Sequence, residues 1–452
     1  MIHSNAKNII LLLVNTHWGE VDWILPVLHK IREEKKDIKL VAVFSSKKLF
    51  DKRKTQLTLY NSLCKYTDKI LYPDPQNIFS KFWDKFVNCL PMRAVAYYTD
   101  RLLQTLLNKP QGTYFTTFLY NTSFVFPKVV NPQDVRVILK DFSNDSRFDR
   151  KIEKCCTNAK IVVFPHATSI LISQDCNRRN NPEHLRYFHK HDLFLVSTKY
   201  SAEWWAEQHC QEDAIPIGFP RFDKWWINEI LSDEKIKNTD DYKWVEENKR
   251  KNNKIVLYLT RHTSPCMLTL DSFNYLIKST LEVVMSHENT VLIIKPHPNQ
   301  SIPQLMNILK DFDSTRWMIA SLQAMLLADI SDFIISMHST CILDSLAVKK
   351  PVVEFFQYKD TPDDYPVKND GYLFCSNGKL GSPQRYLEVV AEADTKDELE
   401  FYINDYFYNS EESRNKIWKQ QQLKFKEICG NSDSASETAA NLILNFLNNN
   451  TQ

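Results

Sequence analysis

Glycine is scarce in this sequence. Only seven glycines occur among 452 residues, whereas an average content of about 7% would give about 30. The sequence accordingly contains neither a Gly-x-Gly-x-x-Gly segment nor a glycine-rich P-loop, the two loops that hold nucleotide phosphates on backbone amides. If this protein binds phosphate, side chains and helix N-termini must provide the contacts.

Other features are absent as well, and each absence excludes a class of protein. The ten cysteines contain no Cys-x-x-Cys pair, so we expect reduced thiols in a cytoplasmic protein. The net charge of +2 provides no basic field for nucleic acid. No apolar run approaches the roughly 18 residues of a membrane span, and the run at 9–14 is too short for a signal peptide.

Short apolar runs alternate with amphipathic stretches along most of the chain. Examples are "NIILLLV", "KLVAVF" and "KIVVF" in the first half, and "KIVLYL", "TVLIIK", "DFIISM" and "PVVEF" in the second. Continuous apolar strands between helices are typical of parallel sheets covered on both faces. We therefore expect an α/β protein with two Rossmann-like parallel-sheet domains facing a cleft. A polar, charged stretch predicts domains at 1–227 and 254–430, a linker at 228–253, and a C-terminal helix and tail at 431–452.

Five of the twelve histidines lie just past an apolar run, namely His17, His166, His262, His297 and His338. Ligands of open parallel sheets bind outside the carboxyl ends of the strands, so these histidines are candidates for a ligand site. They lack the short ligand spacings of zinc sites, and we expect no metal. Anion binding fits their surroundings better.

The second half carries the candidate residues for binding a phosphorylated donor. The prolines on both sides of His297 stiffen its loop, and Lys295 adds a charge. Ser339 and Thr340 follow His338 where a helix is expected to begin, so they could cap it while its amides bind phosphate. Instead of binding a ligand, Ser339 could be a plain N-cap. Glu354 could likewise be a surface carboxylate. The predicted donor-binding set is Arg261, His262, Lys295, His297, His338, Ser339, Thr340 and Glu354, with Arg261 suited to a diphosphate and Glu354 to ribose hydroxyls.

The order of these motifs resembles a group of enzymes. "KPHP", "SDFIISMHSTCILDSLAVKKPVVEF" and "TPDDYP" are similar to the donor-binding half of GT-B transferases that build bacterial surface carbohydrates, and "IPIGFPRFDKW" resembles their GxPRxD segment. The patterns most resemble those of CDP-glycerol glycerophosphotransferases and of capsular Kdo and polysialic acid transferases. His297-Pro298 and Ser339-Thr340 are similar to the HP and SS/ST motifs with which bacterial sialyltransferases hold CMP. The resemblance covers about 215–372 in order and spacing, and the first half mainly at His166.

The resemblance implies a metal-independent transferase without a cofactor. It would move a sugar or polyol phosphate from a CMP- or CDP-activated donor to a glycan or lipid-linked glycan acceptor. His166 is the first candidate for the general base, because histidine titrates near neutral pH. In glycerophosphotransferases a glycine follows the comparable histidine, whereas this chain has Ala167 at that position. Asp22 and Glu20 are therefore further candidates for the general base.

Two alternative functions stay open. A non-hydrolysing UDP-sugar 2-epimerase would share the architecture, although "MHSTC" lacks the glycines of the UDP-binding segment in those enzymes. A non-catalytic nucleotide-sugar-binding subunit would bind without turnover. The aromatic and basic segment 77–107 is either a helix pair packed on the sheet or a surface for an acceptor or for the inner face of the membrane.

Overall fold

The computed structural model describes most of the chain outside a few stretches. The described residues are 8–15, 19–53, 57–72, 95, 98–99, 102, 130–142, 147–166, 168–173, 191–209, 211, 213–264, 267–358, 372–408, 411–430 and 434–448. His17 and most of the segment 77–107, whose roles were predicted above, lie outside them. Among the described helices, none combines the length and the apolar character needed to cross a bilayer.

The chain forms two compact units, which we describe separately. The first comprises residues 1–166, 189–193 and 440–452, and the second comprises 167–188 and 194–439. The first sheet has seven strands in the order β3-β2-β1-β4-β5-β6-β7, and the pairs β1–β2, β1–β4, β2–β3, β4–β5 and β6–β7 are parallel. Its strands are β1 (Ile9–Val14), β2 (Lys39–Phe44), β3 (Lys69–Leu71), β4 (Val135–Asp141), β5 (Lys160–Phe164), β6 (Leu193–Val196) and β7 (Ala214–Pro216).

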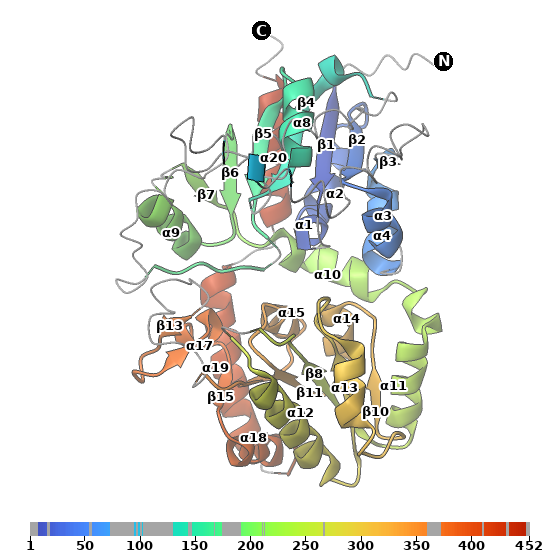
Figure 1. Cartoon of the computed structure of the whole chain (residues 1–452), viewed down its shortest axis with the longest axis vertical. Coiled ribbons are helices and arrows are strands. Elements are labelled where there is room, and N and C mark those ends of the chain that lie inside the picture. The colour runs from blue at the N-terminus through green and yellow to red at the C-terminus, as the bar shows by residue number, and fades with distance from the viewer. Residues whose placement is uncertain are drawn as a thin grey trace. The chain divides into compact units, whose positions relative to one another are not determined.

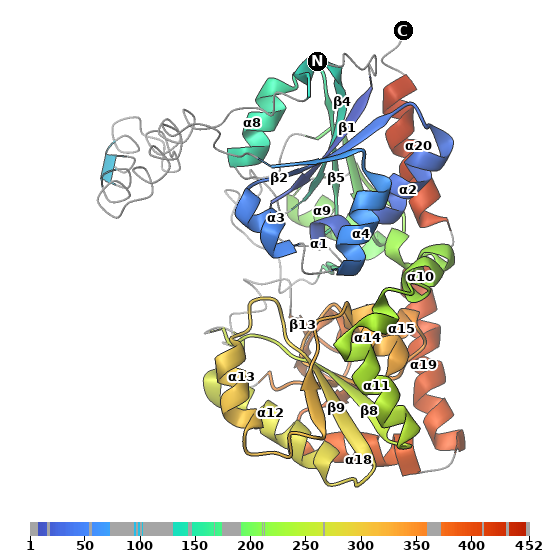
Figure 2. The same cartoon turned by 90° about the vertical axis from the view of Figure 1, so that its right-hand side faces the viewer.

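Helices cover both faces of strands β1 to β5 in the first unit (Figures 1 and 2). Residues of α8 pack with alternate residues of β1, such as Leu11 and Leu13, in one apolar cluster. The helices α2 and α4 lie on the other face (Figure 2). This two-sided burial explains why β1 is apolar at every position. The helices are α1 (Gly19–Asp22), α2 (Leu25–Glu34), α3 (Lys47–Arg53), α4 (Leu57–Tyr66), η1 (Pro132–Asp134) and α8 (Arg147–Cys155).

The second sheet has six strands in the order β10-β9-β8-β11-β12-β15, all paired in parallel. Its central strands β8 and β11 are almost wholly buried. The strands are β8 (Lys254–Leu259), β9 (Thr290–Lys295), β10 (Trp317–Ile319), β11 (Phe333–Ser336), β12 (Val352–Phe355) and β15 (Ala391–Ala393). A short antiparallel pair, β13 (Leu373–Phe374) and β14 (Leu380–Gly381), stands apart from this sheet.

Helices also sandwich the second sheet. α12 and α13 cover one face, and α11, α14, α15 and α19 lie on the other (Figure 2). The helices of this unit are α9 (Lys199–His209), η4 (Pro220–Phe222), α10 (Lys224–Leu231), η5 (Ile236–Asn238), α11 (Asp240–Arg250), α12 (Leu270–Met285), α13 (Ile302–Leu309), α14 (Ala324–Ile330), α15 (Ile342–Ala347), α17 (Pro383–Tyr386), α18 (Lys396–Tyr408) and α19 (Glu411–Cys429), and α20 (Ala435–Asn448) begins here.

Side chains fix where several of these helices begin. Thr239, Thr269 and Ser301 each accept a hydrogen bond from the backbone N–H of the third residue of α11, α12 and α13. Each satisfies one of the amides that a helix leaves unpaired at its start. The caps therefore fix the loops that join the carboxyl ends of β8 and β9 to the helices that follow.

The segment "GFPRFD" is a tightly held turn. Gly218 has φ 90°, a conformation that favours glycine, and Arg221 forms a buried ion pair of 2.7 Å with Asp344 of α15. The carboxylate of Asp223 accepts from the backbone N–H groups of Ala435 and Ser436 at the start of α20. The two charged residues of this motif, Arg221 and Asp223, therefore have structural partners.

The two parallel sheets and their covering helices confirm the fold class predicted from the alternation of strands and helices. The stretch 228–253 contains the second half of α10 and the whole of η5 and α11. The predicted domain limits at 227/228, 253/254 and 430/431 stay a prediction.

Candidate functional site

Four of the five strand-end histidines are described, and each follows the carboxyl end of a parallel strand. His166 follows β5, His262 follows β8, His297 follows β9, and His338 follows β11. In the six-stranded sheet β8 lies between β9 and β11, so His262, His297 and His338 come from three neighbouring strands. His166 belongs to the first unit.

His166 forms a pair with a buried carboxylate. Its Nδ1 lies 2.7 Å from Oδ2 of Asp141, whose side chain is 0% exposed, while the His166 side chain is 27% exposed. Asp141 ends β4 and stands opposite Phe164 of β5 in the sheet register. A carboxylate at Nδ1 holds the hydrogen on that nitrogen, so Nε2 is left as the proton acceptor. This arrangement suits a general base.

The other two candidates for the base occupy different surroundings. Asp22 is the last residue of α1 and is only 6% exposed. It directly precedes Trp23, whose buried ring stacks on Phe164 of β5. Glu20 lies in α1, but its side chain is outside what the structure describes. Asp22 and Glu20 stay predictions.

His262 and His297 contact each other in the second unit. Their Nδ1 atoms are 3.1 Å apart, and Nδ1 of His297 also accepts from the backbone N–H of Asn299 at 3.2 Å. Nδ1 of His297 therefore acts as the acceptor, and the hydrogen between the rings resides on His262. Burial, together with the charge of Arg261, lowers the pKa of His262. In its neutral form His297 then carries its hydrogen on Nε2, where it can donate to a ligand.

A buried amide supports the His297 loop. Gln300 is 9% exposed, and its Oε1 accepts from the His297 backbone N–H and from the Thr260 hydroxyl. Its Nε2 is buried without a hydrogen-bond partner among the described residues. An unpaired buried donor is unfavourable, so a ligand oxygen at this position would satisfy it.

Lys295 and Arg261 bring charge to the same strand ends. Lys295 Nζ donates to the carbonyl of Ser321 at 3.1 Å, and burial lowers the pKa of Lys295. Arg261 donates to the carbonyl of His338 at 2.6 Å. The structure therefore positions both cations through backbone carbonyls, which do not neutralise their charge.

Ser339 and Thr340 do not cap the helix that follows them, contrary to the expectation. The N-cap of α15 is Cys341, which makes no side-chain capping bond. The Ser339 hydroxyl instead accepts from the Cys341 backbone N–H at 3.3 Å, and the Thr340 carbonyl accepts from Thr168 at 3.0 Å. Ser339 accepts in this contact, so its own hydroxyl hydrogen can be donated to a ligand.

Glu354 is fully buried, with 0% exposure. Its Oε1 accepts from Tyr358, and its Oε2 accepts from Ser382 and Arg385. With its oxygens engaged in this way, Glu354 offers no surface to a ribose in this structure. It connects instead, through Tyr358, to His338.

Sequence reasoning missed several residues that hold the predicted ones. Asp141 ends a strand-like run, "VRVILKD", and this signal could have identified it as it did the histidines. Gln300 and Tyr358 lie in loops and Arg385 lies in the short helix α17, where no sequence pattern distinguishes them. Groups of three or more His, Cys, Asp or Glu side chains that could hold a metal ion do not occur among the described residues.

Comparisons with known proteins give matches in structure but not in sequence. No family model matches the sequence, and no curated protein sequence matches it. The co-structure of S. aureus MnaA with UDP has a TM-score of 0.53 at 12% identity, over 98% of this chain and 97% of that chain. The UDP-GlcNAc 2-epimerase from Neisseria meningitidis, bound to UDP-GlcNAc, has a TM-score of 0.52 at 13% identity, over 97% and 100%.

A third solved structure is that of a wall teichoic acid polymerase, TagF, soaked with CDPG. It has a TM-score of 0.53 at 13% identity, over 99% of this chain and 90% of that chain. At such low identity these matches establish the fold alone. Together with the two parallel sheets, they show that the chain has the two-domain α/β architecture of the GT-B fold.

Proposed function

We propose that this protein is a transferase that uses a nucleotide-activated donor. It moves a sugar or a polyol phosphate from a CMP- or CDP-linked donor to a surface-glycan or lipid-linked glycan acceptor. The observation that carries the proposal is the Asp141–His166 pair, a strand-end histidine oriented by a buried carboxylate. Proteins of the same fold have been solved with UDP and with CDPG, which supports a nucleotide donor.

The donor phosphate would bind at the ends of β8, β9 and β11. His297 Nε2–H, the Ser339 hydroxyl and the Lys295 ammonium are donors suited to phosphate oxygens, and Gln300 Nε2 has no hydrogen-bond partner in the part of the chain that the structure describes. Negative charge grows on the leaving nucleotide during transfer, so preorganised donors at this position lower the barrier. This explains how a chain with few glycines could bind a nucleotide.

The acceptor hydroxyl would lose its proton to Nε2 of His166. Its oxygen forms a bond to the anomeric carbon or to the phosphorus of the transferred group. The bond from that atom to the nucleotide phosphate oxygen breaks, and the nucleotide leaves with the electron pair. Asp141 stabilises the imidazolium that forms on His166.

A UDP-sugar 2-epimerase is the second candidate, because the solved structures of this fold include a UDP-GlcNAc 2-epimerase at a similar TM-score. An epimerase converts its sugar nucleotide without any acceptor. A transferase releases nucleotide only when an acceptor is present, and a binding subunit does neither. Assays with and without acceptor therefore separate the three.

The donor class can be tested by calorimetric titration with CMP, CDP, UMP, UDP, GDP and ADP. We predict the tightest binding for a cytidine nucleotide and about 10- to 100-fold weaker binding in His297→Ala, because a hydrogen bond to a charged group contributes about 1.5–3 kcal/mol. His287→Ala is the matched control, because His287 precedes β9 and stacks on Tyr408. It should bind as the wild type does.

The alternative outcomes are equally informative. Preference for UDP would favour the epimerase or a UDP-sugar transferase. Binding that does not depend on His297 would remove the strand-end loop from the donor site. Binding of none of the six nucleotides would refute the proposed donor.

A further inference from the structure

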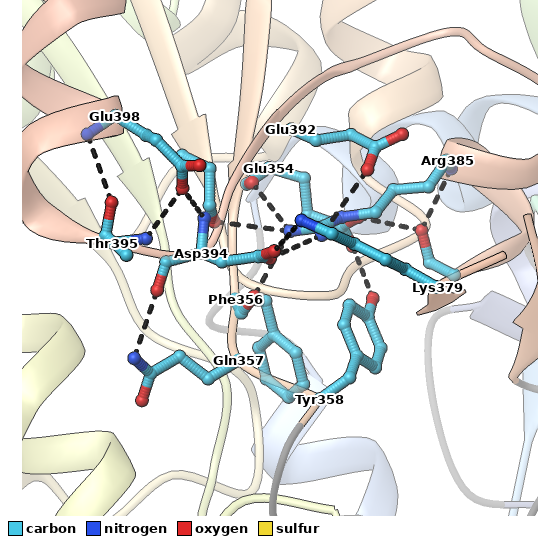
Figure 3. Close-up of polar contacts among 12 residues, drawn as sticks. Glu354, Phe356, Gln357, Tyr358, Lys379, Arg385, Glu392, Asp394, Thr395 and Glu398 are labelled. Atoms are coloured by element: carbon cyan, nitrogen blue, oxygen red, sulfur yellow. Dashed lines mark hydrogen bonds and ion pairs between the residues drawn. The ribbon is translucent and has the colours of Figure 1, made fainter. Parts of the chain in front are cut away.

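A buried ionic network surrounds Arg385 beside the strand end that carries His338. Arg385 is 2% exposed and lies between Glu354 and Asp394 (Figure 3). Its Nε donates to Glu354 Oε2 at 2.8 Å, and its Nη1 donates to Asp394 Oδ1 at 2.6 Å. Its Nη2 donates to the backbone carbonyls of Glu354, Phe356 and Ala393. The guanidinium is thus fixed in position.

The contact with Arg385 favours the ionised form of Glu354. Burial has the largest effect and raises the pKa of the Glu354 carboxyl above its usual value, while the charge of Arg385 and the hydrogen bonds from Ser382, Arg385 and Tyr358 limit that rise. An arginine does not lose its proton in proteins, and a buried cation requires a nearby counter-charge. Glu354 and Asp394 both contact the guanidinium directly and supply that charge. The ionised Glu354 carboxylate accepts hydrogen bonds only.

The Tyr358 hydroxyl connects Glu354 to His338 and determines which ring nitrogen of His338 carries the hydrogen. Its hydroxyl lies 3.2 Å from Glu354 Oε1 and 3.1 Å from His338 Nδ1. The tyrosine has one hydrogen, and an ionised carboxylate can only accept, so that hydrogen points to Glu354. The phenol oxygen must then accept from His338, and the hydrogen of the neutral imidazole lies on Nδ1.

We propose that the Arg385–Glu354–Tyr358 chain holds His338 in the Nδ1–H tautomer, so that Nε2 accepts a hydrogen bond from a neutral donor group of the nucleotide. Within the described residues, Nδ1 is the ring nitrogen of His338 that has a hydrogen bond. An acceptor nitrogen cannot donate to phosphate, so His338 would recognise a ribose hydroxyl or a base amino group. Arg385, Glu354 and Tyr358 act as positioning residues. The ligand part of this inference rests on the proposed function, whereas the tautomer does not.

The neutral state of His338 agrees with its electrostatic surroundings. Burial lowers the pKa of His338 well below the usual histidine value, and the charges of Arg261 and Arg385 lower it further. The Glu354 carboxylate, with Oε1 at 3.9 Å from Nδ1, acts in the opposite direction. His338 is therefore a poor cation for neutralising a phosphate.

The tautomer can be measured in the protein without ligand. Long-range ¹H–¹⁵N correlation spectra of histidine-labelled protein report which ring nitrogen carries the hydrogen. We expect the Nδ1–H form for His338 in the wild type. In Glu354→Gln the side-chain NH₂ donates to Tyr358, whose hydroxyl must then donate to His338 Nδ1, so the spectrum should change to the Nε2–H form. A wild-type His338 in the Nε2–H form would overturn the proposal.

Two further variants keep the test decisive if Glu354→Gln does not fold. Tyr358→Phe removes the link, so we expect His338 to show both tautomers. Tyr275→Phe is the matched control. The Tyr275 hydroxyl accepts from the Lys396 backbone N–H and does not belong to the Arg385–Glu354–Tyr358 series, so this variant should leave the His338 spectrum unchanged. An unaltered His338 spectrum in Tyr358→Phe would contradict the proposed coupling.

Nucleotide analogues identify the group that His338 recognises. Removing the 2′- or 3′-hydroxyl tests the ribose, and exchanging cytosine for uracil tests the base amino group. One of these changes should weaken binding to the wild type about 2- to 10-fold, the range for a neutral hydrogen bond, and should have no effect in Glu354→Gln. Equal affinities in all arms would refute recognition by His338. A protein that binds no nucleotide, yet shows the Nδ1–H tautomer, would refute the proposed function alone.

Discussion

At the scale of single residues, the clearest chemical arrangement is Asp141 with His166. The carboxylate is fully buried and the imidazole is partly exposed, so the contact with Asp141 fixes the ring at Nδ1. This is the difference between a histidine that only packs and one that can take a proton from a ligand. The contact with Asp141 sets the orientation and the tautomer of the His166 ring and places a negative charge beside it.

Exchanging Asp141 for asparagine tests the pair. In Asp141→Asn the amide NH₂ can donate to His166 Nδ1, which moves the imidazole hydrogen to Nε2 and removes the base. We predict a fall in turnover of about 10²–10⁴, with unchanged nucleotide affinity. The control is Asp192→Asn, which alters a carboxylate bonded to Ile161 N at the opposite end of β5. Equal losses in both variants would point to a general structural defect.

Sequence reasoning found positions better than it found roles. The predicted positions of His166, His262, His297 and His338 after strand ends are confirmed, whereas their roles as ligands stay a prediction. The role of Glu354 could not be inferred in this way, because its position at a strand end does not reveal that Tyr358, Ser382 and Arg385 surround it. These partners are separated from Glu354 by 4 to 31 residues, and such contacts depend on tertiary packing.

At the scale of elements, the turn "GFPRFD" connects to two helices. Arg221 pairs with Asp344 of α15, and the side chains are 4% and 2% exposed. Asp223 bonds to the first turn of α20. The motif was noted for its resemblance to transferases, and its charged groups have a structural role in this unit.

Removing one partner of the buried pair should destabilise the second unit. Arg221→Met leaves the Asp344 charge buried, and we expect a loss of about 3–5 kcal/mol in unfolding free energy. Urea unfolding followed by tryptophan fluorescence measures it. The double variant Arg221→Met/Asp344→Leu removes both charges and should recover part of the stability. A single variant within about 0.5 kcal/mol of the wild type, the range of ordinary surface substitutions, would show that the pair does not stabilise this turn.

The helix boundaries show where pattern and structure differ. Ser339 and Thr340 were expected at the start of the helix, and α15 begins at Ile342 with Cys341 as its N-cap. The two extra residues form a turn, closed by the Cys341 N–H on the Ser339 hydroxyl. Serine and threonine favour both caps and turns, so composition alone could not separate the two.

At the scale of the whole molecule, buried histidines should make stability depend on pH. Burial and the charges of Arg261 and Arg385 lower the pKa of His338 well below 6.5, so the unfolded state binds more protons than the folded state. Stability is then highest above pH 6.5 and falls as the pH decreases towards the folded-state pKa. His338 contributes at most about 1.4 kcal/mol per pH unit over this window.

Comparing the wild type with His338→Asn isolates that contribution. The asparagine NH₂ can replace Nδ1–H as a donor to Tyr358 but does not titrate. Urea unfolding at pH 7.5, 6.5 and 5.5 should show a shallower loss of stability in the variant. Parallel losses would mean that His338 is protonated equally in both states.

The architecture of the whole chain was predictable because its signal is repeated. Each apolar run of five or six residues followed by a helix supports the same parallel α/β fold, and both sheets formed as expected. The chemistry of the site depends on a few contacts that are not repeated, such as Asp141 with His166. The fold was therefore accessible from pattern, whereas the tautomers and ion pairs needed the structure.

The most direct test of the proposed function is nucleotide release from CMP- and CDP-activated donors, with and without a glycan acceptor. Wild-type protein should release nucleotide only with acceptor, and His166→Ala should lower that rate about 10²–10⁴-fold while donor affinity stays the same. Turnover by His166→Ala at the wild-type rate would contradict the account of the base, and conversion of a UDP-sugar without acceptor would replace the transferase with the epimerase.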